Sequence, residues 1–159
     1  MRVENEREAM QLAINEARTT MKEGLGGPFG AAVVNMATRE VIAVASNTVL
    51  GDHDPTAHAE VNAIRKASKA LGTHDLSGHY LVATSEPCPM CLSAIVWANI
   101  KVIYYGCTAS DAAEIGFRDE FIYNAIKGKE ASHIASCNIC RDSAIELFNE
   151  YASTQGTIY

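Results

Sequence analysis

The chain has 159 residues, of which 48% are hydrophobic and 20% charged, and its formal net charge is −6. These values are typical of one globular domain that can bury a substantial core. The negative charge and the lack of a Lys/Arg cluster argue against a nucleic-acid-binding protein, which usually carries a basic surface. We therefore expect a small or neutral partner and no nucleic acid.

Neither a membrane span nor a secretion signal is predicted. No apolar run reaches the roughly 18 residues of a transmembrane helix, and the opening residues MRVENEREAMQL are charged and lack an apolar signal core. We expect a cytoplasmic protein with no membrane partner. In that compartment its five cysteines are expected to be metal ligands, catalytic groups or buried apolar residues and not disulfides.

The predicted elements alternate between helices and strands. Apolar residues at helical spacing predict a helix over residues 5–23, and two apolar runs predict a hairpin over 29–35 and 39–47. A loop is expected next, and then a helix over 55–71 with Asp54 as its N-cap and Gly72 as its stop. The remaining predicted elements are a strand over 79–86, a short helix over 88–99 and a strand over 101–107. They are followed by mixed loop and helix over 110–128, a strand over 132–139 and a helix over 141–153. This order indicates a mostly β core layered by helices.

Two segments carry residues with metal-ligand chemistry. PTAHAEVNAIRKA contains His58 and Glu60, and SEPCPMCLSAIVWA contains Cys88 and Cys91, three apart at a predicted helix start. The free N–H groups and positive dipole end there lower thiol pKa values. One nitrogen and two sulfur ligands fit a catalytic zinc, which takes three protein ligands and keeps one position for water. We expect one zinc ion per chain, held by His58, Cys88 and Cys91.

Glu60 is interpreted as a catalytic carboxylate and not as a fourth ligand. On a regular helix, two residues from His58, its side chain would turn about 200° away. Zinc lowers the pKa of its bound water to about 7, and Glu60 can then take that proton and carry it onward. The combination H-x-E, followed about thirty residues later by P-C-x-x-C, is the signature of the zinc nucleobase deaminases.

On these motifs the chain resembles the cytidine and nucleobase deaminase superfamily. GGPFGAAVV, DPTAHAEVNAIRKA, SEPCPMCLSAIVWA and SDAAEIGFRDEFIY are similar to the guanine deaminases of bacteria, a resemblance that covers about residues 26–123. It implies an α/β fold, a three-layer α/β/α sandwich around a five-stranded mixed sheet, in a single deaminase domain over residues 1–159. It also implies zinc-dependent hydrolytic deamination of guanine to xanthine and ammonia.

The resemblance implies further roles in substrate binding. Asn47 would hydrogen-bond the base, and Phe29 and Trp97 would form the walls of its pocket. From the residues alone, an asparagine such as Asn47 more often simply ends a strand, and residues such as Phe29 and Trp97 are more often part of the core than of a pocket.

A second carboxylate is also implied by the resemblance. Asp119 would help to protonate the leaving amino group. Arg118 stands where the family often has another acid, and Glu120 is adjacent, so the choice between Asp119 and Glu120 stays open. An ordinary exposed acid is the alternative for Asp119.

The last two residues, Ile158 and Tyr159, are apolar and aromatic, although chain ends are usually frayed and polar. The resemblance implies a homodimer that exchanges about residues 141–159, so that Tyr159 covers the active site of the partner subunit. Packing of this tail on the chain's own surface, or disorder, is the alternative.

Other functions stay open at this point. One is deamination of another small aminated heterocycle or nucleoside (guanosine, cytosine, an aminotriazine). A second is deamination of tRNA adenosine, which the acidic net charge disfavours. A third is a non-catalytic zinc-binding module, which would have no use for Glu60 beside the metal. His133, Cys137 and Cys140 are compatible with a second metal site or a redox pair, but they lack a fourth ligand and an H-x-E partner.

Overall fold

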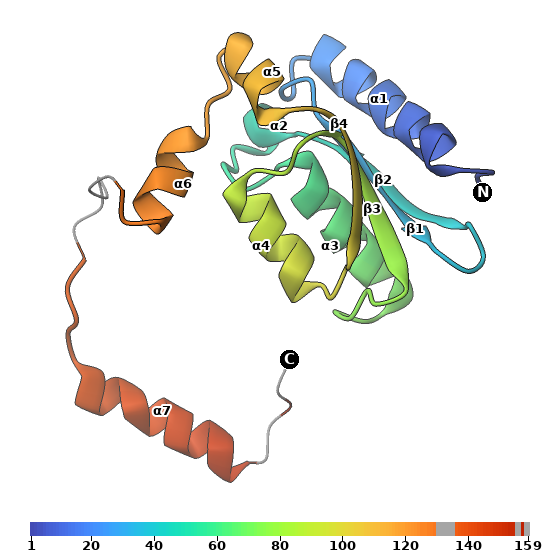
Figure 1. The fold of residues 1–159 in the computed structure, drawn as a ribbon. Helices are drawn as coiled ribbons and strands as arrows, with labels where there is room; N and C mark the ends of the chain where they lie inside the picture. The colour runs from blue at the N-terminus through green and yellow to red at the C-terminus, as the bar shows by residue number, and fades with distance from the viewer. Residues whose placement is uncertain (130–135, 155–156, 158–159) are drawn as a thin grey trace. The chain divides into compact units, whose positions relative to one another are not determined.

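The computed structural model describes residues 1–129, 136–154 and 157 (Figure 1). The chain divides into two compact units, Met1–Tyr123 and Asn124–Tyr159. The first unit contains the sheet and both metal-ligand segments. The expected single domain with an exchanged C-terminal part stays a prediction.

The first unit is built on a mixed sheet with the strand order β2-β1-β3-β4. Its strands are β1 (Gly30–Asn35), β2 (Val41–Ser46), β3 (His79–Ser85) and β4 (Val102–Cys107). β1 is antiparallel to β2 and β3, and β3 is parallel to β4. The prediction of a mixed sheet is confirmed.

The prediction of five strands is wrong for the described residues, which form four. The expected strand over 132–139 lies partly outside them, and residues 136–140 have no regular structure. Ser136 and Asn138 favour turns over strands, and Cys140 has a left-handed backbone, with φ at 52°, where α7 (Arg141–Ser153) begins. The local sequence therefore gives this segment little preference for a strand.

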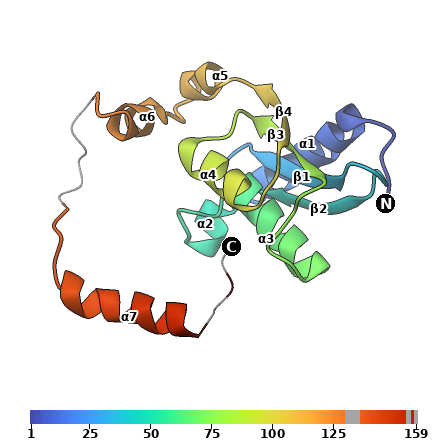
Figure 2. The ribbon, with the colours of Figure 1, turned by 60° about the horizontal axis from the view of Figure 1, so that its bottom comes forward.

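Helices cover both faces of the sheet. α1 (Glu6–Lys22) lies on one face, and α3 (Ala59–Leu71) and α4 (Pro89–Trp97) lie on the other (Figures 1 and 2). Buried alanines of α1, namely Ala9, Ala13 and Ala17, keep that helix close to the strands. A Cβ at Gly30 would meet the Ala13 carbonyl oxygen at 2.0 Å, so this close approach requires glycine.

The strand directions bring distant segments to one edge of the sheet. Since β1 is antiparallel to β2 and β3, and β4 is parallel to β3, the strands β2, β3 and β4 run the same way. Gly30, the first residue of β1, pairs with Ser46, the last of β2. Phe29, Asn47 and Cys88 are therefore all on segments that leave the sheet at this edge.

The start of α3 differs from the predicted start at Pro55. The Asp54 carboxylate accepts hydrogen bonds from the Thr56 N–H at 2.8 Å and from its hydroxyl at 2.7 Å. Asp54 thus closes a turn and does not cap the helix, and His58 is the N-cap residue. Gly72 ends the helix in a left-handed conformation, with φ at 67°, as expected.

The other elements follow the predictions closely. α4, α5 (Ala109–Glu114) and α6 (Glu120–Ile126) lie in the segments predicted to be wholly or partly helical, and α7 matches the predicted 141–153. The expected loop after β2 contains a short helix, α2 (Val49–Asp52). Among the described helices, none combines the length and apolar character needed to cross a membrane.

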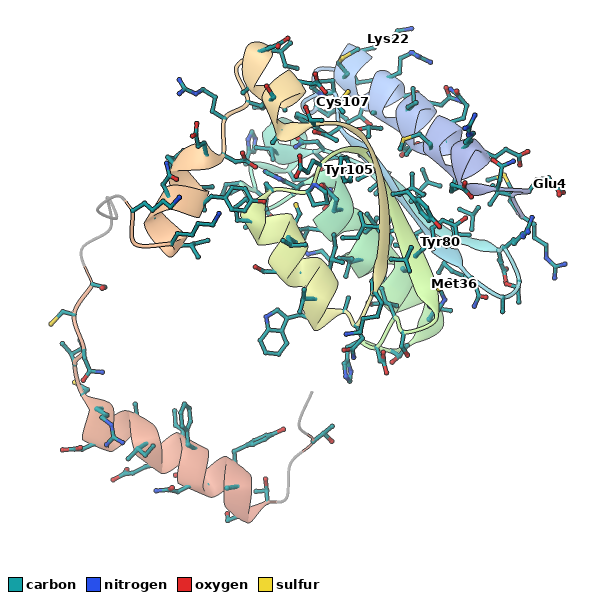
Figure 3. The ribbon with its side chains drawn as sticks, viewed as in Figure 1. Glu4, Lys22, Met36, Tyr80, Tyr105 and Cys107 are labelled. Carbon is teal, nitrogen blue, oxygen red and sulfur yellow. The ribbon has the colours of Figure 1, made fainter. Side chains whose placement is uncertain are left out.

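β4 is an edge strand of the described sheet. Its residues are half-buried or exposed, and the exposed ones include Tyr105 and Cys107, which Figure 3 labels along this strand. Tyr104 packs edge to face on Tyr80 of β3, with ring centroids 5.4 Å apart. The apolar core instead lies between the sheet and the helices on its two faces.

Candidate metal centre and active site

Three predicted metal ligands meet at the sheet edge. The Nδ1 atom of His58 lies 3.6 Å from the Cys88 Sγ atom and 3.5 Å from the Cys91 Sγ atom. Within the described part of the chain, the ligand atoms of these three residues all lie within 4.8 Å of one another. The structure thus brings together residues that are 33 positions apart in the sequence.

The spacing of these atoms fits a zinc ion. Zn–S bonds of about 2.3 Å and a Zn–N bond of about 2.0–2.1 Å at a tetrahedral angle place N and S about 3.6 Å apart. Both observed N···S distances agree with this value. Two thiolates and an imidazole are also ligands that zinc prefers. The residues present therefore fit the expected cofactor.

Two helix N-termini create this arrangement. His58 is the N-cap of α3 and Cys88 the N-cap of α4, and both have extended backbones before the helix. Pro89 is the first residue of α4, where its missing N–H costs no helical hydrogen bond. Since α3 packs against α4, the positive ends of two helix dipoles lie beside the sulfur atoms.

The charge state of the cysteines follows from their contacts. The hydrogen bond with the Cys91 side chain lowers the pKa of the Cys88 thiol, and the hydrogen bond with His58 lowers it further, against the opposing effect of burial. The contact with Cys88 in turn raises the pKa of Cys91. A thiolate at Cys88 is the form that binds a metal.

Glu60 lies beside the three ligands. It is the second residue of α3, and only 7% of it is exposed. Burial raises the pKa of its carboxyl, and the negative charge of Cys88 adds to that effect. The interaction with the Cys91 thiol lowers the pKa of Glu60 and raises that of Cys91. Among the described residues, the group whose ligand atoms all lie within 4.8 Å of one another does not include Glu60.

The expected turn of about 200° between His58 and Glu60 applies only to two residues of a regular helix. His58 is an extended N-cap residue, and α3 begins after it, at Ala59. Glu60 therefore stays beside the ligand set. Its catalytic role stays a prediction.

Asn47 and Phe29 are joined through the glycine turn before β1. The Asn47 N–H donates to the Phe29 carbonyl at 2.9 Å. The Asn47 Oδ1 atom accepts from the backbone N–H groups of Gly27 at 3.3 Å and Val49 at 3.2 Å. Because the amide oxygen is held by the backbone, the amino end of Asn47 is the end that can be offered to a ligand.

Phe117 is an aromatic neighbour that the sequence did not reveal. Its ring packs edge to face on Phe29, with centroids 4.9 Å apart and planes at 89°. A Cβ at Gly27 would lie 3.0 Å from the Phe29 ring and 3.1 Å from the Phe117 ring. The predicted mixed loop and helix over 110–128 carried no signal for this contact.

Asp119 lies near the cysteines, just before α6. Burial raises the pKa of its carboxyl, and the negative charge of Cys88 adds to the effect. It contributes to a pocket of about 340 Å³, whose lining residues are Ala109, Ser110, Ala113, Arg118, Asp119, Glu120 and Tyr123. This described lining does not include the three metal ligands, so the pocket is not itself the metal centre.

Tyr123 is a second residue that sequence reasoning missed. Its hydroxyl donates to the carbonyl of Pro87 at 3.5 Å, and Pro87 is the residue directly before Cys88. The burial of the phenol and the charge of Asp119 raise its pKa. Tyr123 thus links the segment that contains Asp119 to the segment that contains the cysteines.

The remaining predicted site residues stay untested. Trp97 is the last residue of α4 and is 70% exposed, so its role as a pocket wall stays a prediction. Tyr159 and His133 lie outside the described residues. Cys137 and Cys140 are exposed, and they do not belong to the metal-ligand group found in the described part of the chain.

Comparison with known proteins agrees with this site. Residues 3–107 match the family model described as the cytidine and deoxycytidylate deaminase zinc-binding region. The chain is 48% identical to the guanine deaminase of Bacillus subtilis (strain 168) over 117 residues, 74% of each chain. It is 41% identical to the tRNA-specific adenosine deaminase of Agrobacterium fabrum over 111 residues, 69% of this chain and 71% of that protein.

A solved structure agrees as well. The X-ray structure of guanine deaminase from Bacillus subtilis matches with a TM-score of 0.82 and 39% identity, covering 92% of this chain and 94% of that one. The family model spans both metal-ligand segments. The three ligand residues that the fold brings together at the edge of the sheet fit zinc. The chain therefore belongs to the cytidine and deoxycytidylate deaminase family of zinc-dependent enzymes.

Proposed function

We propose that this chain hydrolyses guanine to xanthine and ammonia. The observation that carries the proposal is the convergence of His58, Cys88 and Cys91, at distances suited to zinc, beside the buried Glu60. The similarity to the guanine deaminase of Bacillus subtilis supports guanine as the substrate.

The residues around the metal centre supply the proton transfers. Zinc, when bound, makes a water molecule acidic enough to ionise near neutral pH. Glu60 takes up the proton of the attacking water and delivers it to a ring nitrogen next to C2, the carbon that bears the amino group. Asp119, near Cys88, assists the departure of ammonia.

Asn47 selects the base by hydrogen bonding. Its amide oxygen accepts from two backbone N–H groups, so its amino end faces a ligand as a donor. A donor is complementary to a carbonyl edge such as that of guanine and is mismatched with the amino group that adenine carries at C6. The aromatic pair of Phe29 and Phe117 provides an apolar surface next to this donor.

Two alternatives are less well supported. A tRNA adenosine deaminase shares 41% identity with the chain, but a net charge of −6 disfavours binding to a polyanion. A structural zinc module has no use for a buried carboxylate beside three ligands. Deamination of another small heterocycle or nucleoside, such as guanosine, is the main competing activity.

We also propose that the chain acts as a homodimer. Support comes from exposed apolar side chains, among them Val96 and Trp97 on α4 and Leu147 and Phe148 on α7. Light scattering of the full chain should give the mass of a dimer, and a monomer at the concentration of the assay would contradict this. Exchange of the tail between subunits, and a cytoplasmic location, stay predictions.

The ligand set predicts which cysteines hold zinc. Cys88→Ser should lose the metal, because it removes one of the two thiolates at the centre. The matched control is the double variant Cys137→Ser/Cys140→Ser, which should retain about one zinc per chain by elemental analysis. Loss of zinc from the control together with retention in Cys88→Ser would overturn the assignment.

The role of Glu60 predicts a separation of metal binding from catalysis. Glu60→Gln should retain zinc and lower guanine turnover by about 10²–10⁴-fold, as expected for a general acid–base group. Xanthine formation and zinc content are measured on the same sample. A Glu60→Gln enzyme that is fully active would exclude the proposed proton transfer.

Asp119 and Glu120 can be distinguished by matched substitutions. Asp119→Asn should lower kcat by about 10²-fold or more, because its carboxyl lies near Cys88, whereas Glu120→Gln should stay close to the unmodified enzyme. Both are measured by steady-state kinetics with guanine. The reverse order of effects would assign the second carboxylate to Glu120.

A further inference from the structure

Asn62 occupies a central place in the hydrogen bonding of the site, although it is not a candidate ligand or proton donor. It lies on α3, one turn after His58, and its backbone N–H donates to the His58 carbonyl at 2.9 Å. Its side chain is half-buried. It is therefore held at a fixed distance along the helix from the first metal ligand.

The carboxamide of Asn62 contacts oxygen atoms from two segments, one at the end of β2 and one just before α3. Its Nδ2 atom lies 2.9 Å from the Ser46 carbonyl oxygen, 2.9 Å from the Thr48 Oγ1 atom and 3.3 Å from the Ala57 carbonyl oxygen. One amino group with two hydrogens thus serves three acceptors. No hydrophobic residue of the same size can replace those donors.

These contacts flank Asn47 on both sides. Ser46 and Thr48 are its immediate neighbours in the chain. Asn62 therefore bonds the backbone carbonyl of the residue before Asn47 and the side-chain hydroxyl of the residue after it. The Asn47 carboxamide is oriented by N–H groups of Gly27 and Val49 at 3.3 and 3.2 Å. Its direction therefore depends on the placement of this segment.

The same carboxamide reaches the residue before the first metal ligand. The Ala57 carbonyl accepts from Asn62 Nδ2 and also from the Thr48 N–H at 3.0 Å. Ala57 is followed directly by His58. The segment that contains Asn47 and the segment that contains His58 are thus bonded to each other and to Asn62.

We propose that Asn62 is a positioning residue that sets the distance and orientation of the Asn47 amide relative to the metal centre. This inference rests on the proposed function, because it assigns the Asn47 amide to substrate recognition. Asn62 contacts neither base nor metal and acts through the loop from Ser46 to Thr48. Small displacements of such groups cost large factors in binding and rate.

The test measures guanine binding without turnover. In a Glu60→Gln background, Asn62→Asp keeps the side-chain shape but places a carboxylate against three acceptor oxygens. Isothermal titration calorimetry should show guanine binding weakened by about tenfold or more, while zinc content stays near one per chain. The control Asn15→Asp makes the same chemical change on α1, where Asn15 contacts Gln11 and Arg18, and should leave affinity unchanged.

A second variant covers the case in which Asn62→Asp does not fold. Thr48→Val removes one acceptor of Asn62 and should weaken guanine binding in the same direction by a smaller factor. The Thr48 hydroxyl also donates to Asp52 at 2.5 Å. The control Asp52→Ala removes that contact alone and should bind guanine normally.

The outcomes separate this inference from the proposed function. If the Glu60→Gln parent does not bind guanine, the proposed substrate is wrong. If the parent binds guanine and the folded Asn62→Asp variant binds it equally well, Asn62 is not a positioning residue. A lowered melting temperature with unchanged affinity would also overturn the inference, because it would show a purely structural role. If Asn62→Asp does not fold, unchanged binding by Thr48→Val would overturn it.

Discussion

The meeting of two helix N-termini at one edge of the sheet is the constraint on which the rest of the site depends. His58 and Cys88 are the N-cap residues of α3 and α4, where the first N–H groups of a helix lack intrahelical partners. Both helices pack on the same face of the sheet, so their first residues face a common point. Zinc ligands at that point need no long side chain or flexible loop.

The strand directions determine what surrounds this point. Since β2, β3 and β4 run the same way, their carboxyl ends share one edge, which is where open α/β sheets usually place ligands. The segment after β2 contributes the Asn47 donor, and the segment after β3 contributes the thiolates. The hydrogen bonds of Asn62 tie the segment that contains Asn47 to the segment that contains His58. In the proposed function, this gives the metal and the base a common frame.

Much of the fold and the metal centre could be predicted from the sequence because both leave local signals. The helical spacing of α1 and the ligand types around His58 are visible in short windows. The start of α3 differs from the prediction, because Asp54 followed by Pro55 is typical of a helix N-terminus, whereas the Asp54 side chain closes a turn. Phe117 and Tyr123 could not be predicted as site residues, since their contacts with Phe29 and Pro87 are tertiary and have no periodic pattern.

In the proposed function, this zinc centre acts on guanine through a donor offered by Asn47. The decisive measurement is ammonia release by the purified, zinc-loaded protein, compared for guanine, guanosine, adenine, cytosine and cytidine. A site built on hydrogen bonding can reject a mismatched analogue by about 10⁴–10⁵-fold, so guanine should be turned over and adenine should not. Equal or faster turnover of adenine or cytosine, or no ammonia from guanine, would contradict the account.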